Sequence, residues 1–281
     1  MSAWLIDSPQ RLELDEGVTR LVVRLSSGKL RVVGTDGPAR IEVTRLGSRS
    51  LQVSLDNGTL SVRHDMPDAW WARFGPFWWL LWGWRRYQAW LTIAVPPETV
   101  GSLTLVSGNV VASGLRHGAT VEVTSGSITL MGLGGQVRAK TVSGSIQAMG
   151  VTGDLGLATI SGEITLAESS AEHVFARTVS GSVTCDVNNP LTRDIRLDTT
   201  SGEITVRVPR DANLQVTLGA TSGRVTSAFP EVRGGGVPGR RSAQGMIGSG
   251  SGILSAHAVS GAVSLLAGPA GADLDAAVDA S

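Results

Sequence analysis

A serine followed by a glycine recurs along the chain, and a hydroxyl on a flexible turn is a candidate nucleophile. Eight of these pairs belong to a regular series and begin at Ser107, Ser125, Ser143, Ser161, Ser180, Ser201, Ser222 and Ser260. A serine nucleophile also needs a base close by and, in many hydrolases, a Gly-x-Ser-x-Gly elbow, which the sequence lacks. We therefore interpret these serines as turn residues rather than as catalytic residues.

The other residue types that carry chemistry are scattered. The four histidines form no pair with metal-ligand spacing, and the single cysteine, Cys185, excludes an intrachain disulfide and a cysteine metal cluster. Glu163 and Glu203 lie on the order of 10 Å apart if the Ser-Gly pairs stack at strand spacing, and inverting glycosidases use such a separation. The glycine-rich run 245–252 lacks the Lys-Ser/Thr of a phosphate loop. We predict no catalytic residue, no cofactor and no metal site, and a carbohydrate-active β-helix enzyme is a remote alternative.

The first seven Ser-Gly pairs of this series follow one another at 18–21 residues, and the last gap, 38 residues, is about two such periods. This spacing is typical of a solenoid in which each repeat is one coil. Apolar residues alternate with polar ones between the pairs, as Leu155 and Leu157 do before Ser161, and this period of two indicates strands. Glycine permits a positive φ, so each pair is predicted to form a corner. Small Ser and Thr side chains are expected to turn inward there, with successive corners ~4.8 Å apart. An antiparallel sandwich is the alternative.

The sequence thus predicts an all-β, single-domain β-solenoid (β-helix-like) with an irregular N-terminal β region. Residues 1–97 are predicted to form this region as a cap, with Asn57-Gly58 turning a hairpin. Residues 98–267 are predicted to form the regular coils, interrupted by a Gly- and Arg-rich loop at 230–252. Residues 268–281 are expected to be a disordered tail.

The net charge indicates which partners to expect, and the N-terminal sequence indicates the cellular compartment. Lys+Arg and Asp+Glu both number 24, so the formal net charge is zero and no general electrostatic attraction to nucleic acid is expected. We expect no small-molecule substrate either. The first residues lack a basic region followed by a long apolar run, so we expect no signal peptide and a cytoplasmic protein.

One segment, residues 68–90, breaks the strand pattern and is called the Trp-rich segment below. It holds ten of the thirteen aromatic residues of the chain, together with Arg73, Arg85 and Arg86. It lies between a strand ending near Arg63 and one starting near Trp90, and we interpret this as a hairpin position. The residues predicted to bind a membrane or a protein partner are Trp70, Trp71, Phe74, Phe77, Trp78, Trp79, Trp82, Trp84, Arg85, Arg86 and Tyr87.

Three interpretations of the Trp-rich segment stay open. Its uninterrupted apolar run, Pro76 to Trp84, is too short for a transmembrane helix, which needs ~20 residues. The segment could instead be a buried lid over the open end of the solenoid. It could also be an interfacial membrane anchor, because Trp and Tyr favour the headgroup boundary and Arg meets anionic lipid. A docking surface for a protein partner would also favour Trp and Arg.

The repeated Thr/Val-Ser-Gly-x-Ile/Val-x-Leu/Val pattern and the closing segment from Gly250 to Val263 resemble those of a bacterial family of unknown function. Its members are often labelled putative adhesins and belong with the toastrack-like β-solenoid domains of cell-envelope stress systems. The resemblance covers roughly residues 12–266. It implies a β-solenoid that acts as a non-enzymatic scaffold or sensor, and the adhesin label implies a role at the cell surface.

Two functional hypotheses follow from these observations. The first is a β-solenoid scaffold or sensor that the Trp-rich segment attaches to the inner face of a membrane or to a partner. The second is a self-assembling or protein-interaction module of the adhesin type, which would include a homo-oligomer.

Overall fold

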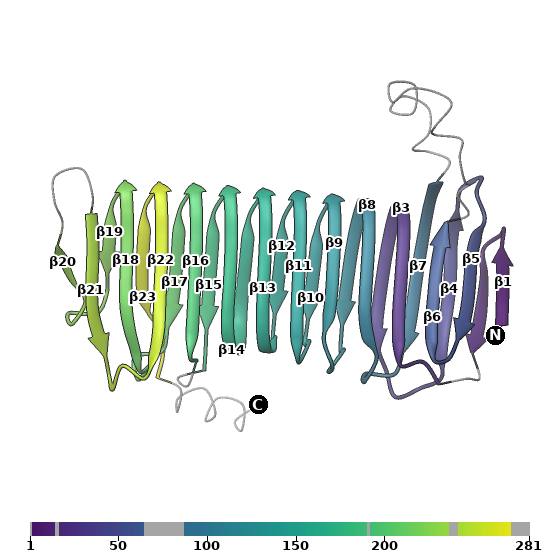
Figure 1. Cartoon of the computed structure of the whole chain (residues 1–281), viewed down its shortest axis with the longest axis horizontal. Coiled ribbons are helices and arrows are strands. Elements are labelled where there is room, and N and C mark those ends of the chain that lie inside the picture. The colour runs from purple at the N-terminus through teal and green to yellow at the C-terminus, as the bar shows by residue number, and fades with distance from the viewer. Residues whose placement is uncertain (1, 15–16, 65–86, 190–191, 236–240, 271–281) are drawn as a thin grey trace, which may run out of the picture. The chain divides into compact units, whose positions relative to one another are not determined.

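The computed structural model describes residues 2–14, 17–64, 87–189, 192–235 and 241–270. The chain divides into two compact units, residues 1–129 and 130–281 (Figure 1). The described residues are mostly β-strand, which confirms the predicted all-β fold. Part of the predicted tail, from residue 271 onward, lies outside the described residues.

The first unit contains long strands that make coils and short strands that cover their end. Its strands are β1 (Ser2–Ile6), β2 (Gln10–Leu14), β3 (Arg20–Gly34), β4 (Ala39–Leu46), β5 (Leu51–Asp56), β6 (Thr59–His64), β7 (Gln88–Val95), β8 (Val100–Ser113) and β9 (Ala119–Ser125).

Parallel pairing begins at β3, which runs alongside β8 from Arg20 to Val33. The other edge of β3 pairs in parallel with two strands in succession, β6 over its first half and β7 over its second half. Beyond these strands the pairing is antiparallel, in β5 with β6, β1 with β5, β4 with β7 and β2 with β4. The predicted irregular N-terminal β region is therefore confirmed, and its pairing is partly antiparallel. The hairpin at Asn57-Gly58, where both residues have positive φ, is confirmed as well.

The second unit repeats one coil, made of a longer strand, a Ser-Gly corner and a shorter strand. β10 (Ile128–Met131) spans the boundary of the units. The other strands are β11 (Gln136–Ser143), β12 (Ile146–Met149), β13 (Thr152–Ser161), β14 (Ile164–Ser180), β15 (Val183–Val187), β16 (Asp194–Ser201), β17 (Ile204–Val208), β18 (Leu214–Ser222), β19 (Val225–Ser227), β20 (Arg233–Gly235), β21 (Arg241–Ile247), β22 (Gly252–Ser260) and β23 (Val263–Ala267).

The core of the second unit lies between the strands before and after each corner. In one coil, Val137 and Ala139 from β11 and Ile146 and Ala148 from β12 are all at most 2% exposed. Side chains between them along each strand point to solvent, as the period of two predicts. The core is therefore a ladder of apolar side chains repeated from coil to coil.

Glycine is required at the corners for two reasons. Gly162 has φ +152°, and a Cβ placed on it would lie 2.0 Å from the carbonyl oxygen of Gly144 in the preceding coil. Such an approach excludes any side chain. At four of the corners a buried threonine holds the inward position, at Thr141, Thr159, Thr178 and Thr199, which confirms the predicted inward threonines. The predicted inward serines are wrong, because the corner serines do not point into the core. Thr159 is buried and donates from Oγ1 to the Gly144 carbonyl oxygen at 3.3 Å, whereas Ser161 is exposed.

The coils of the second unit do not stack in sequence order. β22 pairs in parallel with β16 on one edge and with β18 on the other, and β23 pairs with β17 and β19 in the same way. Figure 1 shows the yellow β22 between the greener β16 and β18. The last coil of the chain, made of β22 and β23, thus lies between the coil of β16 and β17 and the coil of β18 and β19.

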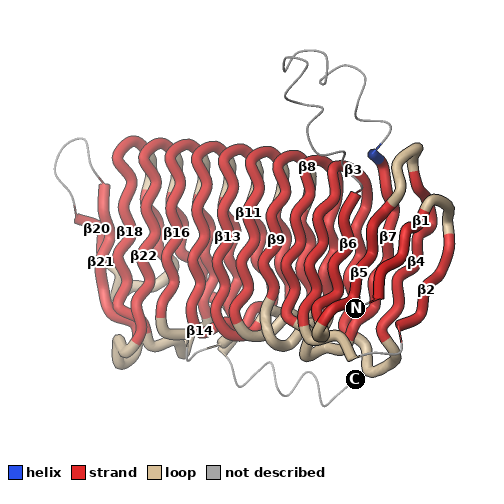
Figure 2. The backbone as a smooth tube through the Cα atoms, turned by 45° about the vertical axis from the view of Figure 1, so that its right-hand side comes forward, coloured by secondary structure: helices blue, strands red, loops and turns tan. Residues whose placement is uncertain are grey.

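The predicted loop at 230–252 differs from the structure, because much of it forms strands. β21 pairs antiparallel with the free edge of β18, and β20 pairs antiparallel with β21 (Figure 2). Ala243 and Ile247 of β21 are buried against the coil. These strands satisfy backbone groups that an uncovered end coil would leave unpaired.

Candidate binding site at the root of the Trp-rich segment

Most of the predicted binding residues lie outside the part of the chain that the structure describes. Of the eleven, only Tyr87 is described; the others, Trp70, Trp71, Phe74, Phe77, Trp78, Trp79, Trp82, Trp84, Arg85 and Arg86, fall within residues 65–86. The described residues at the two ends of 65–86, together with the residues of β3, β4 and β7 and of 47–50 that lie beside them, are called the root of the Trp-rich segment.

The root occupies a coil corner, which corrects the predicted hairpin position. β3 pairs Arg24 with Arg63 of β6 and Ser27 with Gln88 of β7, in both cases in parallel. Two residues of β3 separate these pairs, and on the partner side only His64 and Tyr87 are described between them. Residues 65–86 are therefore an insertion into an otherwise continuous coil, at the place where β3 has its own Ser27-Gly28 corner.

The corner itself closes as tightly here as in the other coils. A Cβ on Gly28, which has φ +139°, would lie 1.8 Å from the carbonyl oxygen of Ala89. Gln88-Ala89 thus takes the position of a Ser-Gly pair beside Ser27-Gly28. The insertion leaves the stacking of this coil on β3 intact.

The two ends of the insertion touch through their side chains. The rings of His64 and Tyr87 meet edge to face, with centroids 5.9 Å apart and planes at 83°. His64 is 5% exposed, and its Nδ1 accepts a hydrogen bond from the backbone N–H of Ser26 at 3.2 Å. Burial lowers the pKa of His64 from 6.5 to about 4. The ring is therefore neutral at pH 7, with its hydrogen on Nε2.

Tyr87, the one predicted binding residue that the structure describes, is largely buried. Its side chain is 8% exposed, and the guanidinium of Arg49 lies 5.7 Å from its ring centroid. A side chain so buried has little area left for lipid or a partner. We therefore assign Tyr87 to the packing of the root.

The other described aromatic of the segment, Trp90, lies on the outer face of β7 between two cations. Lys29 of β3 and Arg45 of β4 are its register partners on either side. The Lys29 Nζ lies 4.7 Å and the Arg45 guanidinium 5.2 Å from the Trp90 ring centroid. Both distances are typical of cation–π contacts.

A hollow of about 370 Å³ opens beside Trp90 and includes Lys29, Arg31, Thr44 and Asn109 in its lining. None of the four cations at the root forms an ion pair with a described residue; these are Lys29, Arg31, Arg45 and Arg49. The root is thus locally basic, although the whole chain carries no net formal charge. Such a hollow is suited to an anion such as phosphate or carboxylate.

The residues considered for catalysis are not assembled into a site. Among the described residues, no group of three or more His, Cys, Asp or Glu could hold a metal ion. Glu163 and Glu203 are exposed, and the corner containing Ser182 separates them. Cys185 is buried, and burial, together with the charge of Asp186, raises its pKa to about 12. A protonated buried thiol is a packing residue and not a nucleophile.

No helix among the described residues is long and apolar enough to cross a membrane.

The fold defines the protein as an all-β solenoid with stacked Ser-Gly corners. The sequence model of the Toastrack DUF4097 family matches residues 18–266, so the chain belongs to that family. This confirms the resemblance drawn from the repeats. A comparison with curated proteins found no match.

Three solved structures are similar at low identity. A putative cell adhesion protein from Clostridium sporogenes is 10% identical, with 93% of this chain and 100% of that chain covered and a TM-score of 0.28. A putative adhesin from Parabacteroides distasonis is 9% identical, with coverages of 94% and 97% and a TM-score of 0.30. A putative lipid binding protein from the same organism is 9% identical, with coverages of 92% and 96% and a TM-score of 0.33. The family assignment rests on the family model and not on these structures.

The residues predicted from sequence do not include the basic cluster around Trp90. A signal for it was present, because Lys29 and Arg31 share the outward parity of their strand. The contribution of Arg45 depends on the antiparallel register of β4 against β7, which local sequence does not specify.

Proposed function

We propose that this protein is a non-enzymatic scaffold or sensor module that its Trp-rich segment attaches to the inner face of a membrane containing anionic lipid. One observation carries the proposal. The aromatic insertion starts and ends at a single coil corner, and cations that form no ion pair with a described residue lie beside that corner. The solenoid supplies a rigid support, and the root fixes where the segment is attached.

The chemistry of the inserted residues fits an interfacial anchor. Trp side chains favour the boundary between headgroups and acyl chains, and Arg73, Arg85 and Arg86 would meet lipid phosphates. If four large aromatic side chains leave water, the gross gain is roughly 6–12 kcal/mol. That gain, reduced by the cost of ordering the segment, is sufficient for reversible attachment.

The basic root would add an electrostatic contribution. Each cation held near an anionic membrane surface contributes about 1 kcal/mol. Lys29, Arg31 and Arg45 together would therefore favour anionic over zwitterionic membranes by about 3 kcal/mol, or roughly a hundredfold in affinity. Salt should weaken this contribution, because ions screen exposed charges.

Flotation with vesicles tests the anchor. The full chain should float with phosphatidylcholine vesicles containing phosphatidylglycerol, and a Trp78→Ser/Trp79→Ser/Trp82→Ser variant should stay at the bottom of the gradient. A Lys29→Gln/Arg31→Gln/Arg45→Gln variant should lose the preference for phosphatidylglycerol. A matched control, Lys140→Gln/Arg210→Gln/Arg224→Gln, removes three exposed cations elsewhere and should float like the wild type. Equal flotation of all four proteins, or of none, would contradict the anchor.

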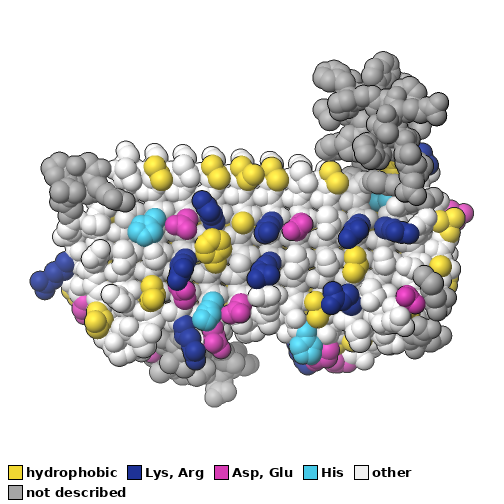
Figure 3. All heavy atoms as spheres, in the orientation of Figure 1, with side chains coloured by type: hydrophobic (Ala, Val, Ile, Leu, Met, Phe, Trp, Pro, Cys, Tyr) yellow, Lys and Arg dark blue, Asp and Glu magenta, His cyan; other side chains and the backbone are white. Residues whose placement is uncertain are grey.

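A second candidate function, self-association, is favoured by one specific surface. The residue before the serine of several corners is an exposed apolar side chain, and these residues form what we call the apolar crest. Those in the second unit are Val142, Ile160, Val179 and Val259, which are 46–53% exposed. Figure 3 shows hydrophobic side chains aligned along this edge. Aligned apolar side chains of this kind can pair with a second copy of the chain.

Threonine is compatible with the fold at the crest position, because Thr200 and Thr221 hold this position in two other coils. Replacing the four apolar crest residues by threonine should therefore leave the fold intact. If the crest mediates self-association, the wild type sediments as an oligomer and the threonine variant as a monomer. A monomeric wild type would exclude this second candidate and leave the membrane anchor untouched.

A further inference from the structure

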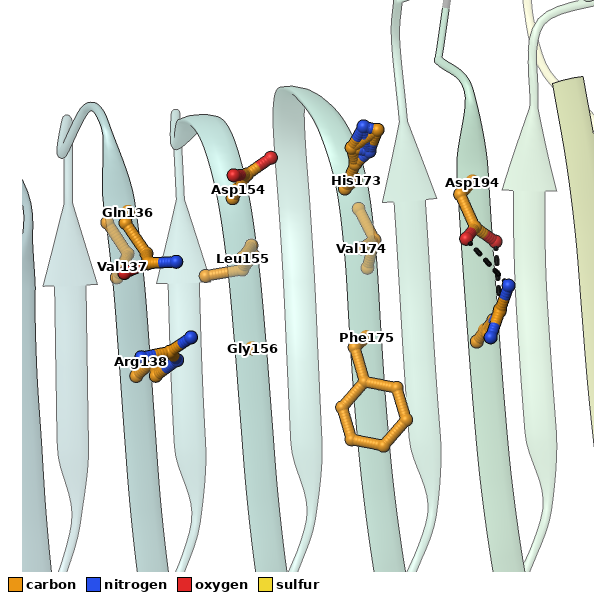
Figure 4. Close-up of a pocket in the computed structure, with 11 residues that line it drawn as sticks. Gln136, Val137, Arg138, Asp154, Leu155, Gly156, His173, Val174, Phe175 and Asp194 are labelled. Atoms are coloured by element: carbon orange, nitrogen blue, oxygen red, sulfur yellow. Dashed lines mark hydrogen bonds and ion pairs between the residues drawn. The ribbon is translucent and has the colours of Figure 1, made fainter.

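The second unit carries a hollow of about 350 Å³ on the outer face of its longer strands, β11, β13, β14 and β16 (Figure 4). Two rows of side chains line it, each in register across the four strands. The first row is Gln136, Asp154, His173 and Asp194, and the second is Arg138, Gly156, Phe175 and Arg196.

Gly156 creates the space, and the backbone does not require a glycine there. Its φ lies outside the left-handed region, and a Cβ would lie 3.7 Å from Arg138 Cγ and 3.9 Å from the Val137 carbonyl oxygen. Both are ordinary contacts, unlike those at the corner glycines. Glycine inside a strand lowers stability relative to alanine. The open space between Arg138 and Phe175 is the structural consequence of this glycine (Figure 4).

Phe175 forms an apolar wall of the hollow. It is 42% exposed, and it is the register partner of Gly156 on the next strand. Of the five aromatic side chains in the described ranges, it is the only one classed as exposed. An exposed phenyl ring beside an empty strand position offers its face to a flat apolar surface.

The polar groups beside the ring come from the four strands that line the hollow, and they balance in charge. Asp154 and Asp194 flank His173 in the first row, and Arg138 and Arg196 flank the hollow in the second. Arg196 is held by Asp194 at 3.1–3.2 Å. The two carboxylates and the two guanidiniums cancel in charge, so the hollow attracts neither polyanions nor polycations.

We propose that this hollow binds a neutral oligosaccharide. The C–H face of a pyranose ring would stack on Phe175 over Gly156. Its hydroxyls would donate to Asp154 and accept from Arg138 and Gln136, as in sites where an apolar surface is combined with a few oriented polar groups. The lining residues of the hollow come from four stacked strands, at ~4.8 Å per strand, and such a span suits an extended chain of sugars. The site is independent of the root and of membrane attachment.

The test uses the full chain and three neutral probes: cellohexaose, mannohexaose and N-acetylchitohexaose. Binding is measured by calorimetry and by shifts of backbone amide signals. We expect saturable binding of at least one probe, with shifts confined to β11, β13, β14 and β16. Phe175→Ala should weaken it at least tenfold, and Phe175→Trp should retain it.

Matched substitutions on one strand separate loss of the hollow from loss of the fold. Gly156→Gln fills the hollow and should abolish binding. Ala158→Gln, at the next outward position of β13, should bind like the wild type. Wild-type melting temperatures for both variants would establish that the fold is retained.

Absence of binding to all three probes at millimolar concentration would overturn the proposal. So would binding that survives both Phe175→Ala and Gly156→Gln. Tight binding of a sulfated glycan, lost in Arg138→Gln and accompanied by no binding of the neutral probes, would also overturn it in favour of an acidic ligand.

Discussion

His64 and Tyr87 pack ring against ring, with centroids 5.9 Å apart, at the two ends of an insertion made within one coil. The register of β3 places them as consecutive residues of that coil. The contact therefore closes the coil at the point of the insertion. Two properties of the root can therefore be tested. Its stability should depend on pH, and its coil should close without the inserted residues.

The stability of the protein should depend on the protonation of His64. Its pKa is lowered from 6.5 to about 4, so the unfolded state binds more protons between these values. Stability is therefore full above pH 6.5 and falls as the pH decreases towards 4, by about 3 kcal/mol at pH 4. Chemical denaturation of the wild type and of His64→Asn, measured at pH 7 and pH 4, isolates this contribution. A wild type that loses no more stability than His64→Asn on acidification would contradict it.

Two glycines of β13 and its corner should respond in opposite ways to alanine. Gly162→Ala places a Cβ 2.0 Å from the Gly144 carbonyl oxygen and should destabilise the protein by about 3 kcal/mol or more. Gly156→Ala meets no atom closer than 3.7 Å and should stabilise it by roughly 0.5–1 kcal/mol. Thermal unfolding of the two variants is the measurement. A similar loss in both would mean that the corners have no special requirement for glycine.

The inward threonines should contribute unequally, according to their hydrogen bonds. Thr159 Oγ1 donates to the Gly144 carbonyl oxygen, whereas the buried Thr141 Oγ1 has no hydrogen bond to a described residue. Thr159→Val should therefore cost about 1 kcal/mol, and Thr141→Val should be neutral or stabilising. Urea denaturation compares the two. Equal losses would show that the hydroxyl of Thr159 contributes nothing beyond its volume.

The repeating part of the fold could be predicted from sequence because it is local. The Ser-Gly period identified the corners, and alternation around residues such as Leu155 and Leu157 identified the inward faces. The Asn57-Gly58 turn was equally local, since both residues adopt the positive φ that a tight hairpin needs.

The arrangement of strands that are far apart in sequence could not be predicted in the same way. The corners at Ser201, Ser222 and Ser260 are chemically alike, so nothing local indicates that β22 inserts between β16 and β18. The strands β20 and β21 were missed because their Gly- and Arg-rich composition resembles a loop. The corner position of the Trp-rich segment was missed because it depends on β6 and β7 both pairing in parallel with β3.

We propose that the inserted residues attach the protein to a membrane while the coil closes without them. Deletion of residues 65–86 tests this claim, because it joins His64 to Tyr87 as the register of β3 requires. Flotation with phosphatidylglycerol vesicles is measured together with the far-ultraviolet circular dichroism and melting temperature of the variant. We predict a folded variant with an unchanged strand spectrum that no longer floats with the vesicles. A folded variant that floats as well as the wild type would contradict the claim.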